Sequence, residues 1–121
     1  MSVRDLLRDC RPTVHEVTVN GKTFFVKSLS GEGRQSFSEM SKEKDGSLPV
    51  QMIAALGLCE QDGSMCFDCS TEKGRILANV ELKEVDGAVL QAIALKLLQV
   101  SGLSKDSAGD AEKKSEASQS D

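Results

Sequence analysis

The sequence predicts a small α+β domain followed by a tail that does not fold. Three features carry this prediction: an Asn-Gly pair between two strand-like runs, an apolar helical segment from Val85 to Val100, and a final stretch, 104–121, whose only apolar side chains are alanines. Ordering that stretch would bury almost nothing against a backbone entropy cost of ~1–2 kcal/mol per residue. We therefore expect one α+β domain over 1–103 and a disordered acidic tail over 104–121.

The composition narrows the class of protein. Aromatic residues make up only 3% of the 121 residues, with no tryptophan or tyrosine, so the core must be mostly aliphatic. The net charge is −4 and no basic stripe forms, which argues against nucleic acid as a partner. No run approaches ~18 apolar residues and the charged N-terminus lacks the apolar centre of a signal peptide, so we expect a cytoplasmic protein without membrane contact.

The first element is a short amphipathic helix. Ser2 can cap it, Val3, Leu6 and Leu7 recur at helical spacing, and Pro12 ends it because the residue before a proline avoids the helical region. We expect this helix to pack on the domain, with a frayed terminus as the alternative.

A β-hairpin follows. Two β-branched or aromatic runs, 14–19 and 22–27, flank Asn20-Gly21, and that pair suits a type I′ turn, which needs positive φ at both central positions. His15, the only histidine, lies on the first strand with no implied Ser or Cys partner, which favours a plain strand residue over a catalyst.

Ser30 can cap a second helix that runs to about Lys44 and places Phe37 and Met40 on one face. Its glycines and serines lower helix propensity, so packing would have to hold it. A polar linker, 42–47, follows, with Asp45-Gly46 as a turn.

The apolar run 50–59 fits a buried helix or a buried strand by periodicity alone. The turn residues at 61–63, followed by 65–67, imply an extended end and a second short hairpin, so we expect helix first and strand second. Thr71 then caps a helix to about Asn79.

The last helix has the widest apolar surface in the chain and needs cover on two sides. A central core helix is the favoured interpretation, and an exposed face for a partner or for self-association is the alternative. If the helix serves a partner, its binding residues are Val89, Ile93, Leu95, Leu97 and Leu98.

The cysteines raise the question of a metal site. Cys66 and Cys69 form a CxxC with Cys59 nearby, and His15 or Cys10 could add a ligand. A structural zinc site usually needs two spaced pairs, and the second pair is missing, so we expect reduced thiols and no cofactor. A small zinc-binding regulatory module that uses Cys59, Cys66 and Cys69 remains the alternative function. No paired carboxylates, Ser-His or Cys-His arrangement, or phosphate loop has convincing spacing, and we do not expect an enzyme.

The order of these blocks resembles the tail assembly chaperones of long-tailed, siphovirus-like bacteriophages and prophages. The resemblance lies in the apolar run, Asp-Gly and Phe segment from Ile53 to Phe67, in the long helix that ends at Ser101-Gly102-Leu103, and in the Ala-Glu-Lys-Lys-Ser-Glu-Ala tail, 111–117.

The resemblance implies a non-enzymatic protein of the host bacterial cytoplasm that coats the tape measure protein, keeps its apolar helices soluble, recruits major tail tube subunits and is absent from the finished virion. Many copies on one client would gain avidity, and we expect a homo-oligomer. In such proteins a longer product often arises by ribosomal frameshifting, for which Lys113-Lys114 is a candidate location.

Overall fold

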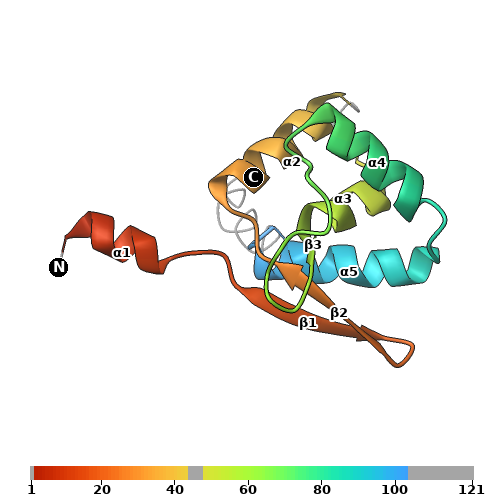
Figure 1. Cartoon of the computed structure of the whole chain (residues 1–121), viewed down its shortest axis with the longest axis horizontal. Coiled ribbons are helices and arrows are strands. Elements are labelled where there is room, and N and C mark those ends of the chain that lie inside the picture. Colours follow the sequence, from red (N-terminus) through yellow and green to blue (C-terminus); the bar gives the residue numbers. More distant parts are fainter. Residues whose placement is uncertain (1, 44–47, 104–121) are drawn as a thin grey trace, which may run out of the picture.

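The computed structural model describes residues 2–43 and 48–103 and has the α+β class expected from the sequence. The Asp45-Gly46 turn, the tail 104–121 and Lys113-Lys114 lie outside these residues. These residues form five helices and a three-stranded antiparallel sheet of order β1-β2-β3 (Figure 1). The elements are α1 (Val3–Asp9), β1 (Val14–Val19), β2 (Lys22–Lys27), α2 (Gly31–Glu43), α3 (Val50–Gly57), β3 (Leu58–Cys59), α4 (Glu72–Leu82) and α5 (Gly87–Val100). Among them, no helix has the length and apolar character that crossing a bilayer requires.

The hairpin forms where Asn20-Gly21 predicts it. Both turn residues have positive φ, 54° at Asn20 and 77° at Gly21, as a type I′ turn requires. The register pairs Val17 with Phe24, and the central strand β2 carries the fully buried Val26. The sheet therefore begins from a turn that the local sequence specifies.

The apolar run 50–59 does form a helix and then a strand, α3 and β3, as expected. β3 is only two residues long and pairs Leu58 with Val26 of β2. The predicted second hairpin is reduced to a single bridge between Cys59 and Met65, across a turn in which Gly63 has φ of 92°. A left-handed turn residue brings the chain back here without a full second strand.

α5 is the central core helix. Its residues Leu90, Ile93, Ala94 and Leu97 are buried, and it packs against α3 on one side and the hairpin strands on the other. It begins at Gly87, two residues later than expected, because the carboxylate of Asp86 accepts hydrogen bonds from the backbone N–H groups of Ala88 and Val89 at 2.8 and 3.4 Å. The sequence expectation of a core helix is confirmed.

α2 and α4 lie over α3 in the upper part of Figure 1. Ser30 and Thr71 cap them as predicted, each side-chain oxygen accepting a backbone N–H three residues later. α4 ends at Leu82, three residues beyond the expected end, because Leu82 is buried and extends the packed face. The α5 terminus is tied back through Ser101, whose hydroxyl oxygen accepts from the Leu29 N–H at 3.0 Å.

α1 forms as expected, and Ser2 accepts a hydrogen bond from the Asp5 N–H. The expectation that it packs on the domain is wrong for this chain. None of its residues is buried, and Figure 1 shows it standing apart from the remaining elements. Pro12 prevents the helix from continuing and favours an extended chain before it, so a non-helical connector separates α1 from β1.

Candidate functional site

The five partner residues proposed on the last helix do not form one surface. Ile93 and Leu97 are only 2% and 0% exposed and belong to the domain's own core, while Val89 and Leu98 are half-buried. Leu95 alone is well exposed. The prediction of one partner surface on α5 fails because α3 and the hairpin cover two sides of this helix. The remaining side presents one leucine, and a single exposed leucine is ordinary on a protein surface.

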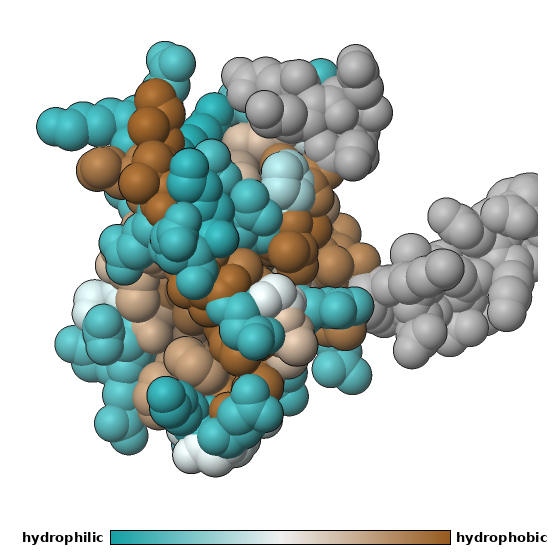
Figure 2. All heavy atoms as spheres, turned by 90° about the vertical axis from the view of Figure 1, so that its right-hand side faces the viewer, coloured by the Kyte–Doolittle hydropathy of each residue, from teal (hydrophilic) through white to brown (hydrophobic). Residues whose placement is uncertain are grey.

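Three exposed apolar residues lie together on α4 instead. Ile76, Leu77 and Val80 are 55%, 57% and 54% exposed. Their spacing of i, i+1 and i+4 places them together on one side of the helix, opposite the buried Ala78 and Leu82. We call these three residues the α4 face. Figure 2, viewed from the side where α4 turns into α5, shows apolar side chains reaching the surface among hydrophilic ones.

A groove of about 590 Å³ adjoins the α4 face. Ile76 borders both, and the buried side chains of Met40 and Met52 contribute apolar surface to the groove. Its other lining residues are Leu48, Pro49, Gln51, Glu72, Arg75 and Asn79. The groove therefore lies where α2, α3 and α4 meet, with apolar surface inside and polar side chains along it.

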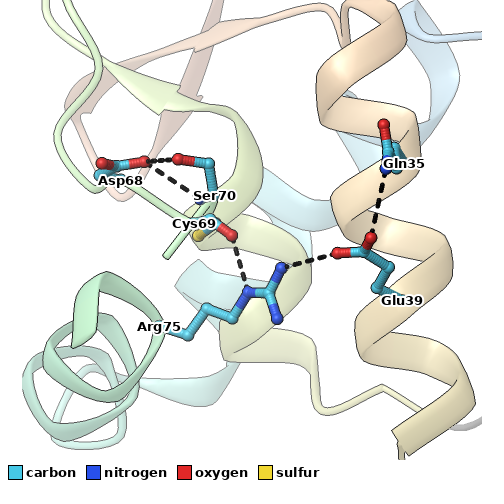
Figure 3. A network of polar contacts seen from close by, with 6 residues as sticks. All are labelled: Gln35, Glu39, Asp68, Cys69, Ser70 and Arg75. Atoms are coloured by element: carbon cyan, nitrogen blue, oxygen red, sulfur yellow. Dashed lines mark hydrogen bonds and ion pairs between the residues drawn. The ribbon is translucent and has the colours of Figure 1, made fainter. Parts of the chain in front are cut away.

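Arg75 fixes α4 beside this groove (Figure 3). Its Nε donates to the carbonyl oxygen of Cys69 at 2.7 Å, and its terminal nitrogen pairs with the Glu39 carboxylate of α2 at 3.2 Å. Because the arginine side chain is largely buried, these bonds connect α4 to α2 and to the preceding loop more firmly than an exposed ion pair would. The apolar face is thus carried by an anchored helix.

A second contact joins α3 to α4 at the groove. The Gln51 amide of α3 donates to the Asn79 side-chain oxygen of α4 at 3.1 Å. Together with the buried Ala78 and Leu82, it holds α4 against α3. The α4 face is consequently preorganised, which lowers the entropic cost of binding a partner.

The sequence does not single out the α4 face because the longer α5 carries more apolar residues. The signal was present: apolar residues at 76, 77, 78, 80 and 82 point to both sides of an eleven-residue helix. A helix with apolar residues on both sides must be covered on both or leave one side free. The structure covers one side only.

The cysteines are not arranged as a metal site in the part of the chain that the structure describes, where no three potential ligands gather. All four thiols are free; Cys59 and Cys69 are buried, and Cys10 and Cys66 are exposed. His15 instead lies on β1 with its Nε2 2.7 Å from the Thr13 hydroxyl. The spacing Cys66-Cys69 therefore does not bring the alternative zinc ligands together.

The environment of these thiols also opposes the thiolate form that metals and redox partners need. Desolvation raises the pKa of the Cys59 and Cys69 thiols. Desolvation and then the nearby Glu60 carboxylate raise the pKa of Cys66 to about 11. The Cys66 sulfur lies 3.6 Å from that carboxylate and donates toward it. No observation on these residues favours the zinc-module alternative.

Cys66 should react slowly with alkylating reagents despite its exposure. With its pKa at about 11, the thiolate fraction at pH 8 is small, and the labelling rate should keep rising with pH up to that value. Glu60→Gln removes a negative charge beside the sulfur, so it should lower the Cys66 pKa and speed labelling at pH 8. Mass spectrometry of the alkylated protein measures both effects. Equal rates in Glu60→Gln and the unmodified chain would contradict the assigned contact.

The fold and this surface are those of a small α+β domain that presents an anchored apolar helix face and an adjoining groove. A scan against protein-family models and searches of curated proteins and solved structures found no match for this chain.

Proposed function

We propose that this chain is a non-enzymatic tail assembly chaperone of the kind found in long-tailed bacteriophages, which binds and solubilises the tape measure protein and helps recruit major tail tube subunits. The observation that carries the proposal is the α4 face: three large apolar side chains, each more than half exposed, on one side of an anchored helix. A stable domain that leaves such a face open has a surface available for a partner.

The client chemistry follows from that surface. An amphipathic helix can lay its apolar stripe along Ile76, Leu77 and Val80 and place one side chain into the groove above Met40 and Met52. A tape measure protein, with long apolar helices, would offer many such stripes. The complex would gain solubility from the chaperone's net charge of −4.

Each contact would be weak, because a face of three residues lies below the size of a standard protein interface. Many copies along one elongated client would raise the overall affinity through effective concentration. This mode of action needs no catalytic group and no cofactor. We propose that the protein acts in the host cytoplasm during assembly, before the virion is complete.

Co-expression with a tape measure protein of a long-tailed bacteriophage tests the proposed function. We expect the soluble fraction of the client to rise when this chain is present, and the two proteins to co-purify through a tag on either one. An empty vector and an unrelated acidic domain of similar size serve as controls. A client that stays equally insoluble in all three cases, with no complex, would refute the chaperone function.

A further inference from the structure

α1 is an amphipathic helix without cover. Val3, Leu6 and Leu7 lie on one side of it at spacings of three and four, and all three are half or more exposed. A seven-residue helix is far below the ~12–15 residues at which isolated helices become marginally stable. We therefore expect α1 to be stabilised by packing its apolar stripe on another surface.

The basic and acidic residues of α1 lie on opposite sides of its apolar stripe. At 100° per residue, Arg4 and Arg8 flank the apolar stripe on one side, and Asp5 and Asp9 flank it on the other. Asp5 and Arg8 pair with each other at 3.1 Å across the back of the helix. Arg4 and Asp9 have no ion-pair partner within residues 2–43 and 48–103. They remain available to a surface that α1 would meet.

The chain's own α4 face is out of reach for α1. The connector 10–13 spans at most ~14 Å when extended, and Figure 1 places α1 and α4 at opposite ends of the molecule. The hollow nearest α1, beside Pro12, is lined by serines and acids and also by the apolar Leu29, Met65 and Phe67, but no residue of α1 is buried against it. Within residues 2–43 and 48–103 the apolar stripe of α1 therefore stays open to another molecule.

We propose that α1 of one copy docks antiparallel on the α4 face of a second copy. Val3, Leu6 and Leu7 would meet Ile76, Leu77 and Val80, three exposed apolar residues against three. The antiparallel direction brings the arginine at the start of α1 to Glu81 at the end of α4, and the aspartate at the end of α1 to Lys73 at its start. Every copy carries both halves of this contact.

In the proposed dimer, each copy places its α1 helix on the α4 face of the other copy. One seven-residue arm buries less than a stable interface needs, whereas two arms exchanged between two copies double the contact and close a dimer. This inference goes beyond the proposed function because it requires no client. If both hold, a client helix and the arm of a neighbouring copy compete for the same face.

Sedimentation of the purified full chain over a concentration series to several hundred micromolar tests the arm. We expect a concentration-dependent dimer, and a loss of more than about tenfold in association for Leu6→Glu/Leu7→Glu and, separately, for Leu77→Glu. Leu95→Glu, an equally exposed leucine on α5, should leave association unchanged. Mixing the arm variant with the face variant should give a heterodimer that is weaker than the wild-type dimer but stronger than the self-association of either variant, because it keeps one of the two contacts. A monomeric wild-type chain, or a dimer insensitive to the arm variant, would overturn the proposal.

Disulfide trapping tests the direction of docking, even when association is weak. Cys10 caps the end of α1 and is exposed, so in a Cys66→Ser background Lys73→Cys should give a covalent dimer under mild oxidation. Lys83→Cys, at the far end of α4, should give much less, and Cys10→Ser should abolish the product. Equal trapping at positions 73 and 83 would contradict the antiparallel contact. None of these readouts involves the client, so failure here leaves the co-expression test intact.

Discussion

Replacing Leu97 by alanine should lower the free energy of unfolding by about 2–5 kcal/mol, the range for truncating a fully buried leucine. Leu97 is 0% exposed and lies against Gly57 of α3, where an added methyl group would stand 2.5 Å from a Leu97 δ-carbon. The absence of a side chain at Gly57 thus lets α3 and α5 approach closely. Urea denaturation followed by circular dichroism measures the loss.

Leu95→Ala is the matched control on the same helix. Leu95 is 56% exposed, so this change should alter the free energy of unfolding by less than about 0.5 kcal/mol. Comparing Leu97→Ala with Leu95→Ala distinguishes the buried side of α5 from its exposed side, because the two leucines lie within one turn of the helix. Similar losses at both positions, or a larger loss at Leu95, would contradict the orientation of α5.

Gly74→Ala should destabilise the domain by more than about 2 kcal/mol, the effect of overpacking where backbone must move. A methyl group at Gly74 would overlap the Asp68 carbonyl oxygen and stand 2.7 Å from its carbonyl carbon. The loop would have to shift away from the first turn of α4, where Thr71 caps the helix and Arg75 reaches the Cys69 carbonyl. The same denaturation experiment measures the loss of stability, and NMR chemical shifts of residues next to Gly74 report the movement of the loop.

Gly87→Ala provides the comparison for Gly74. A methyl group at Gly87 meets no atom within 4 Å at the start of α5, so the change should be neutral or stabilise by up to about 1 kcal/mol. If Gly74→Ala were equally harmless, α4 would not sit against the Asp68 carbonyl as described, and the anchoring of the α4 face would be refuted.

The elements that the sequence predicts well are those with local causes. The hairpin depends on two positive-φ residues, Asn20 and Gly21, and these are adjacent in the chain. The helix starts at Ser2, Ser30 and Thr71 depend on one side chain and a backbone N–H three residues away. Such interactions need no tertiary information, and all were predictable.

The features that the sequence did not predict depend on distant packing. Nothing local says whether α1 rests on the domain, because its apolar stripe suits an internal or an external partner equally. Which leucines of α5 face inward depends on where α3 and the hairpin lie. The second hairpin has only one bridge, between Cys59 and Met65. The turn at Gly63 brings these two residues together, but no local sequence feature extends the strand pairing beyond Met65.

The candidate site lies on α4 and not, as predicted, on α5, because distant packing decides which apolar residues are buried. Apolar periodicity identified the helix with the most apolar residues, but the core uses that helix, and the exposed surface lies on the shorter α4. Likewise, the spacing of Cys66 and Cys69 suggested ligands, whereas the geometry orients Cys66 toward the Glu60 carboxylate. Sequence patterns locate apolar and reactive residues, and the fold decides which remain available.

The solubility of the tape measure protein co-expressed with matched surface variants tests the central claim most directly. Leu77→Glu places a charge on the α4 face, and Leu95→Glu places the same charge on an equally exposed leucine of α5. The account predicts that Leu77→Glu loses most of the client from the soluble fraction and from the co-purified complex, while Leu95→Glu behaves like the unmodified chain. Both variants should keep the melting temperature of the domain. Full client solubility with Leu77→Glu, or its loss with Leu95→Glu alone, would contradict the account.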